Sequence, residues 1–346
     1  MKLGLFQNVQ WPEATDQRTQ FANAIDQTIL AEQVGFDSAF FVEHHWTRHG
    51  ILSSTLALLA YIAARTTRIR LGTAVLVIPL HDPVRLVEEA STVDLLSGGR
   101  LDLGVGRGFQ WLEFDGFGLD IAESRARYDE ALEVILKAWR EPKLNHKGRY
   151  WRYGDVSVEP KPLQKPHPPV WAGAGNKESA KKVGRLGLRL MLSSGARFES
   201  ITPMIDAYKS GLAEGRHAFS SDHVLLSRIA HIAETRARAW EIAGPYYNWF
   251  RKTVAEVSQT PGQPSRFNAT PLTPKLHGPI GSERDDPGFL FCTPDEASRY
   301  IEEVAALGVG QVIFQGNWGG IPQDDMVRSL TLVGREVIPR FAAGVK

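Results

Sequence analysis

Short runs of apolar and β-branched residues alternate with helix-patterned segments along almost the whole of this 346-residue chain. Each run is short enough for one strand, and the segments between them carry apolar residues at helical spacing. Strands are expected at 3–6, 38–42, 69–78, 101–105, 169–172, 188–192, 224–232 and 311–314. Repeated strand–helix units bury their apolar faces as a parallel sheet covered by helices. Eight units at this length predict an α/β fold, a closed (β/α)8 TIM barrel.

An open, doubly wound sheet is the alternative α/β fold for such an alternation. That fold usually places a glycine fingerprint directly after its first strand. Here Gln7, Asn8, Val9 and Gln10 follow the first strand, and none of them is a glycine. The sequence therefore favours the barrel, with one domain over residues 1–346.

Two segments depart from the alternation. Residues 150–158 are aromatic and alternating, follow the fourth expected helix (121–139), and lead into the proline-rich stretch 160–169. They predict a small β-insertion after helix four. Residues 258–291, before the eighth strand, are rich in proline and glycine and show no periodicity. A long irregular stretch in a compact domain is typical of a functional loop, so we expect a mobile lid loop over the barrel mouth.

Composition excludes several classes of partner. Lys and Arg total 40 against 39 for Asp and Glu, so the chain carries no basic footprint for nucleic acid or an anionic membrane. Cys292 is the single cysteine, which excludes an internal disulfide and fits a reducing cytoplasm. No signal peptide is visible, and the most apolar helix-length window, 51–64, is too short to span a bilayer. A cytoplasmic protein is expected.

The second expected strand runs directly into Glu43, His44 and His45. Three titratable groups at the end of a buried strand are costly unless they face a cavity or water. Histidine changes charge near neutral pH, so this position suggests proton chemistry, although one histidine could simply bond a neighbouring loop. Adjacent strand residues point to opposite sides, so His44 and His45 do not converge on one ion, and no metal site is predicted.

Two further strand ends suit a phosphate. Arg107 lies between Gly106 and Gly108, where a guanidinium could grip a phosphate or could instead pair with a nearby carboxylate such as Glu113 or Asp115. The fifth strand ends in Gly173, Ala174 and Gly175 and leads into a helix. Backbone N–H groups at a helix start favour an anion; Asn176 is a candidate N-cap, and Ser179 could add a hydroxyl.

Several motifs together resemble the bacterial luciferase-like flavin monooxygenases, closest to the luciferase α-subunit branch. They are Glu43-His44-His45-Trp46, Gly72-Thr73-Ala74-Val75, Pro83-Val84-Arg85, Ser97-Gly98-Gly99-Arg100 and Gly104-Val105-Gly106-Arg107-Gly108. The resemblance implies a TIM barrel that binds reduced FMN (FMNH2) supplied by a separate NAD(P)H:flavin reductase, with O2 as co-substrate. A C4a-hydroperoxyflavin would then oxygenate a small organic substrate: an aldehyde, an alkane, or an aromatic or polyketide metabolite. It also implies a homodimer.

The resemblance also assigns roles to individual residues. His44 matches the catalytic histidine, and Arg107 matches the phosphate-binding arginine. The stretch Ala74-Val75 falls where the family often has a non-proline cis peptide beneath the flavin ring, and Glu113 falls where luciferase has an acidic residue near the flavin. The phosphate-binding turn corresponds to Ala174, Gly175, Asn176 and Ser179.

Departures from the luciferase pattern point to a reshaped pocket. Gly175-Asn176 stand where the luciferase α-subunit has Glu-Ser, which shifts the phosphate grip toward the backbone. Gly106 stands in place of a cysteine and Gln110 in place of a tyrosine, which weighs against light emission and long-chain aldehydes. Nearby aromatic residues line a larger pocket or belong to the core: Trp111, Phe114, Phe117, Trp249 and Phe250.

Two other readings stay open within this resemblance. Sister branches of the family use the deazaflavin F420 for hydride transfer instead of FMN. A non-catalytic flavin-binding subunit would be marked by loss of the catalytic histidine, and His44 is present.

Overall fold

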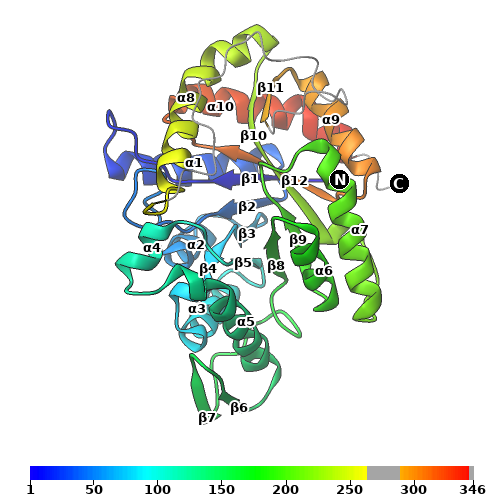
Figure 1. Cartoon of the computed structure of the whole chain (residues 1–346). Helices are drawn as coiled ribbons and strands as arrows, with labels where there is room; N and C mark the ends of the chain where they lie inside the picture. Colours follow the sequence, from blue (N-terminus) through cyan, green and yellow to red (C-terminus); the bar gives the residue numbers. More distant parts are fainter. Residues whose placement is uncertain (263–288, 343–346) are drawn as a thin grey trace.

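Eight parallel strands close into a barrel in this computed structural model, which describes residues 1–262 and 289–342 (Figure 1). Strand β12 pairs with β1, and β10 pairs with both β9 and β12, so the ring has no open edge. The predicted TIM barrel is confirmed. In spatial order its strands are β1 (Lys2–Gln7), β2 (Ser38–Phe41), β3 (Arg70–Thr73), β5 (Leu101–Gly106), β8 (Val170–Ala174), β9 (Arg189–Leu192), β10 (Val224–Ile232) and β12 (Gln311–Gly316).

Helices surround the barrel (Figure 1). Their ends follow local sequence signals. Asp16 caps the first helix by accepting from the Thr19 N–H, and Gly35 ends it in the left-handed conformation, with φ 105°. The helices are α1 (Gln17–Val34), α2 (Thr55–Ala63), α3 (Pro83–Leu96), α4 (Trp111–Gly116), α5 (Ser124–Arg140), α6 (Lys177–Arg185), α7 (Phe198–Glu214), α8 (Arg236–Val257), α9 (Pro294–Ala306), α10 (Gln323–Leu332) and α11 (Ile338–Ala342). Within residues 1–262 and 289–342, no helix has the length and apolar character needed to cross a membrane.

The expected third strand, 69–78, is interrupted in the structure. Strand β3 ends at Thr73, the Ala74–Val75 peptide is cis, and β4 (Leu76–Val77) resumes the pairing with β5. At this break the Thr73 hydroxyl bonds both the N–H and the C=O of Gly104, at 2.8 and 2.7 Å. A side chain at Gly104 would collide with the Thr73 carbonyl, so a glycine is needed for this approach.

The β-insertion after the fourth predicted helix is present, but it begins earlier than expected. It is an antiparallel hairpin of β6 (Leu144–Lys147) and β7 (Arg152–Val156), which projects beyond α5 at the bottom of the view in Figure 1. Its turn is fixed by Glu130, whose carboxylate accepts the backbone N–H groups of Arg149, Tyr150 and Trp151. The first strand was missed because the charged, polar stretch around it lacks strand periodicity.

The prediction of an irregular stretch over 258–291 is wrong at the C-terminal end of that stretch. Phe289–Cys292 form strand β11, which pairs in parallel with the C-terminal half of β10. Phe289 and Phe291 pack against Tyr247, and Phe291 also stacks on Trp318 at 5.4 Å. These aromatic contacts explain why the segment is a buried strand. Residues 263–288, which hold most of the predicted lid, lie outside the described residues.

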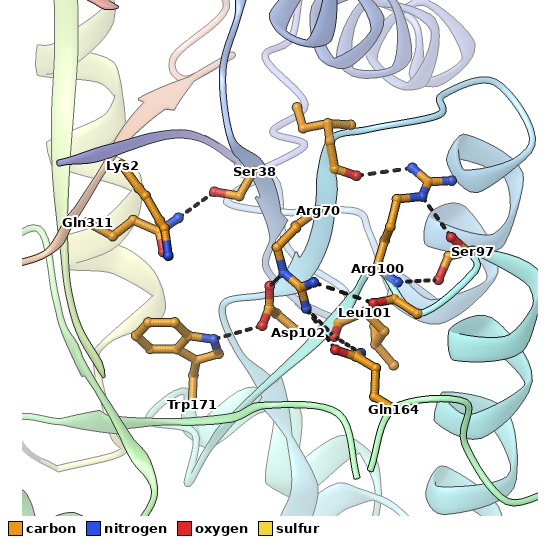
Figure 2. Close-up of polar contacts among 12 residues, drawn as sticks. Lys2, Ser38, Arg70, Ser97, Arg100, Leu101, Asp102, Gln164, Trp171 and Gln311 are labelled. Carbon is orange, nitrogen blue, oxygen red and sulfur yellow. Dashed lines mark hydrogen bonds and ion pairs between the residues drawn. The ribbon is translucent and has the colours of Figure 1, made fainter. Parts of the chain in front are cut away.

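Polar side chains bond one another at the N-terminal end of the barrel (Figure 2). Asp102 on β5 accepts from Arg70 Nε at 2.6 Å and from Trp171 Nε1 at 3.2 Å, and Arg189 lies 3.8 Å away. Gln164 adds bonds to Arg70 and to the Leu101 carbonyl. Since the charges at this end satisfy one another, we read it as the stabilising face of the barrel, with ligands expected at the opposite end.

Asp102→Ala is expected to lower the free energy of unfolding by about 3 kcal/mol, since it leaves the buried Trp171 N–H and the partly buried Arg70 without their acceptor. The value is at the low end for a buried ion pair because the Arg70 side chain is partly exposed. Urea denaturation of the full chain measures it. Asp222→Ala is the matched control: Asp222 pairs with Lys2 in solvent, so its loss should cost less than about 1 kcal/mol. Equal losses in the two variants would contradict the structural role of Asp102.

Candidate active site

A cavity of about 390 Å³ opens at the C-terminal ends of the strands. It lies above the aromatic and aliphatic residues that fill the barrel, among them Phe40, Trp171 and Ile313. The cavity is lined by Phe6, Val42, Glu43, His44, Ala74, Val75, Val77, Gly106, Arg107, Gly108, Phe109, Glu113, Gly173, Ala174, Gly175, Met191, Leu192, Ser193, Ser194, Ser227 and Ile313. The structure therefore brings most of the predicted site residues together around one cavity.

Two predicted residues lie apart from that lining. Asn176 caps α6, because its side chain accepts from the Ser179 N–H at 2.9 Å. The Ser179 hydroxyl in turn bonds the Asn176 side chain and backbone. The predicted N-cap is confirmed, but Asn176 is exposed, Ser179 is half-buried, and both side chains are occupied by capping. A phosphate near α6 would therefore meet backbone groups more than these two side chains.

The floor of the cavity is apolar and tightly fitted. Ala74 and Val75 are joined by the cis peptide that the resemblance implied. A side chain at Gly106 would come within 2.3 Å of Val75 Cγ2, so the glycine leaves room for the branched valine. A Cβ at Gly175 would meet no atom within 4 Å, which leaves open space beside the end of β8.

His44 is held by a buried carboxylate. Its Nδ1 lies 2.9 Å from Glu113 Oε1, and the same oxygen accepts the backbone N–H of His45 at 3.1 Å. The Gln110 amide lies 2.8 Å from the same ring nitrogen, and with Nδ1 donating to Glu113 it must turn its oxygen, not its NH2, toward the ring. Because the carboxylate of Glu113 accepts, Nδ1 carries the hydrogen and Nε2 is left to exchange a proton. This arrangement fits general acid–base chemistry at Nε2.

Glu43 and His45 form a second buried pair, for which the sequence predicts no catalytic role. Glu43 Oε1 lies 2.7 Å from His45 Nε2 and 2.8 Å from His81 Nε2, and its Oε2 accepts the Val77 N–H at 2.7 Å. Burial opposes ionisation, but the hydrogen bonds from His45 and His81 outweigh it and lower the pKa of Glu43 to about 2. The ionised carboxylate thus fastens the end of β2 to β4.

Sequence reasoning missed two histidines near the site. His81, which contacts Glu43, lies on a turn after β4 where no motif marks it. His49 is buried, with its ring centroid 4.7 Å from that of His44. Gly50 permits this contact, because a Cβ there would lie 2.8 Å from His44 Cβ. In the sequence, the adjacent residues His49 and Gly50, which follow His44 by five and six positions, were the signal that could have indicated this contact.

The aromatic residues proposed for a larger pocket lie in different parts of the structure. Phe250 lines a second cavity of about 520 Å³ that shares His44 with the first. Phe114 is fully buried in the core, and Trp249 Nε1 bonds the exposed Glu13. Phe117 is exposed and packs on Trp46 at 4.6 Å. Among the described residues, no three His, Cys, Asp or Glu side chains gather so as to hold a metal ion.

Comparison with known proteins identifies the family. The model of the luciferase-like monooxygenase family matches residues 1–304, and the chain belongs to this family. The oxygenase component of a flavin-dependent trigonelline monooxygenase from Acinetobacter baylyi is 26% identical over 75% of this chain and 74% of its own length. An F420-dependent glucose-6-phosphate dehydrogenase from Amycolatopsis mediterranei is 27% identical over 92% of this chain and 94% of its own length.

A solved structure agrees with the barrel throughout. The monooxygenase RslO1 from Streptomyces bottropensis superposes with a TM-score of 0.86 and 25% identity, covering 99% of this chain and 100% of its own. Family and relatives together support an oxidoreductase. Because relatives use either a flavin or F420, they leave the choice of cofactor open.

Glu43→Gln is expected to lower the pKa of His81. Burial lowers that pKa, but the hydrogen bond and charge of Glu43 raise it above 6.5. The stability that His81 contributes is therefore full below pH 6.5 and is lost as pH rises through the raised value. Titration of the His81 ring by NMR measures the shift, and in the variant the pKa should fall, because burial is then opposed only by the charge of Glu89.

Glu89→Gln is the matched control for that titration. Glu89 acts on His81 only through space, as the smallest of the causes that raise its pKa. Its loss should change the pKa much less than the loss of Glu43. An unchanged His81 pKa in Glu43→Gln would contradict the pairing.

Proposed function

We propose that this chain is the oxygenase of a two-component flavin-dependent monooxygenase. The observation that carries the proposal is the His44–Glu113 pair in the wall of a cavity that also contains Arg107 and the Ala74–Val75 peptide. A separate NAD(P)H:flavin reductase would supply reduced FMN, in line with the relative named as an oxygenase component. We further propose one domain over residues 1–346, acting as a homodimer.

The residues around the first cavity fit FMN. Ala74, Val75 and Gly106 offer an apolar floor for a flat ring system. Arg107 lines the same cavity and supplies a cation suited to a phosphate. Helix α6 begins directly beyond Ala174 and Gly175, and its N-terminus favours an anion at that side.

Bound reduced FMN would supply the electrons that activate O2 for transfer of one oxygen atom to a small organic substrate. The chain's own part is to orient, to exclude water and to move a proton. Glu113 fixes the His44 ring with Nδ1–H toward the carboxylate, so Nε2 serves as the acid/base group. Burial of both side chains keeps this proton away from bulk water.

An F420-dependent oxidoreductase is the second candidate. It is favoured by the F420-dependent relative, which aligns with 92% of this chain. Parallel titrations of the purified chain with FMN and F420 distinguish the two candidate functions. Tighter binding of F420 would contradict the monooxygenase proposal. If the chain binds reduced flavin and this flavin reacts with O2, but no substrate is oxygenated, the result supports a non-catalytic flavin-binding subunit instead.

Arg107→Ala is expected to weaken FMN binding by about 10- to 100-fold, since a charge-assisted bond to phosphate is worth about 1.5–3 kcal/mol. Riboflavin, which lacks the phosphate, should bind parent and variant alike. Calorimetry with each ligand measures the difference. Arg85→Ala removes an exposed arginine on α3 that pairs with Glu89, and it should leave FMN binding unchanged. Unchanged FMN binding in Arg107→Ala would remove Arg107 from the phosphate site.

His44→Ala is expected to slow oxygenation by about 10²- to 10⁴-fold, the range for a lost acid/base group. Reduced FMN and ¹⁸O2 are supplied with a panel of aldehydes and cyclic ketones, and mass spectrometry measures ¹⁸O in the product. FMN affinity should change little, because the loss lies in proton transfer. His146→Ala is a control, since that histidine pairs with Glu130 beside the remote hairpin. A His44→Ala variant as fast as the parent would end the assignment.

A further inference from the structure

The segment that follows His44 turns back and returns to it. The Gly50 N–H donates to the Thr47 carbonyl at 3.3 Å, which closes a tight turn, and the His44 N–H donates to the Leu52 carbonyl at 3.1 Å. This return places the ring of His49 against that of His44, with centroids 4.7 Å apart and planes tilted by 54°. Both side chains are buried. The chain therefore packs a second histidine on the one proposed as the acid/base group.

Backbone bonds on both sides of His49 fasten this segment to the residues that follow β1. The Trp11 N–H donates to the Arg48 carbonyl at 3.0 Å, and the Ile51 N–H donates to the Val9 carbonyl at 2.9 Å. These bonds bring side chains of the segment after β1 within reach of the ring. Neither bond uses the side chain at position 49, so both remain available when that side chain is substituted.

Both nitrogens of the His49 ring have partners in that segment. The Gly319 N–H donates to Gln10 Oε1 at 2.6 Å, so the Gln10 NH2 faces His49 Nδ1, 3.3 Å away. Because Nδ1 accepts, the ring hydrogen lies on Nε2. The Asn8 amide lies 3.5 Å from Nε2 and, with its oxygen turned toward the ring, accepts this hydrogen. Contacts at both nitrogens therefore hold the ring in one orientation.

The His49 ring is neutral. Burial, and after it the neighbouring His44, lowers the pKa of His49 well below its usual range. The two contacts with Gln10 and Asn8 need only one hydrogen on the ring, so they are complete in the neutral form. A charged ring in contact with His44 would oppose the uptake of a proton there, whereas a neutral ring does not.

We propose that His49 is a positioning residue, which keeps the His44 ring at the angle at which Nε2 exchanges a proton. Glu113 bonds His44 at one nitrogen, and a ring held by one hydrogen bond can still tilt about it. The packed ring of His49 removes that freedom. The inference rests on the proposed function, in which His44 moves the proton.

His49→Ala is expected to slow oxygenation by about 10- to 100-fold, since a misplacement of about 1 Å can cost about 10²-fold. FMN affinity should stay unchanged. In the His44→Ala background, where the group that His49 positions is absent, His49→Ala should change the remaining rate by less than about twofold. His49→Phe keeps a ring against His44 and should recover part of the lost rate. The ¹⁸O2 assay above measures all four proteins beside the parent.

¹⁵N NMR of the full chain with labelled histidine, recorded without flavin, gives a readout independent of activity. In the parent, the hydrogen of His44 lies on Nδ1 and that of His49 on Nε2. His49→Ala should give His44 a mixture of both tautomers, because its ring can tilt away from Glu113, and His49→Phe should restore the single form. His167→Phe is the matched control: His167 stacks on Trp139 of α5, and its loss should change neither the rate nor the His44 signals.

The proposal is overturned if His49→Ala slows the parent and the His44→Ala variant equally, or if the His44 tautomer is the same with and without His49. A hydrogen on Nδ1 of His49 in the parent would also overturn it. Should His49→Ala fail to fold, His49→Leu fills more of the volume without a flat ring and replaces it. If the parent oxygenates no substrate, the proposed function fails, and the His44 spectra alone decide whether His49 positions that ring.

Discussion

The buried carboxylate of Glu43 is the interaction on which the geometry of the site depends. Its two oxygens bond His45, His81 and the Val77 N–H, and so join the end of β2 to the strand that follows the cis peptide. A buried ion without partners would be costly, so these three donors are needed together. The adjacent residue, His44, is thereby held at the rim, where Glu113 sets the direction of its ring.

The two ends of the barrel use polar groups in opposite ways. At the N-terminal end, Asp102 accepts hydrogen bonds from Arg70 and Trp171. At the C-terminal end, polar side chains line two cavities that share His44. The N-terminal end supplies stability, and the C-terminal end places its polar groups around the cavities.

Much of this architecture could be predicted from the sequence, because eight strand–helix units leave few folds to choose from. Active sites of such barrels lie at the C-terminal ends of the strands, and this rule predicts that His44, Arg107 and Gly175 surround one mouth of the barrel. What could not be predicted depends on neighbours distant in sequence. The bonds of Thr73 need Gly104 beside it, β11 needs the aromatic residues of α8, and the contact of His49 with His44 needs Gly50. Composition gives no sign of such pairings.

The contact between Gly106 and Val75 also bears on how the pocket can change over time or by engineering. A side chain at 106 would strike Val75 Cγ2, so the two positions share one fixed volume beneath the cavity floor. A larger residue at position 106 alone should destabilise the fold. The same residue combined with a smaller one at position 75 should be tolerated. New substrate shapes at this floor are therefore reached by paired exchanges, and screens of single substitutions will overlook them.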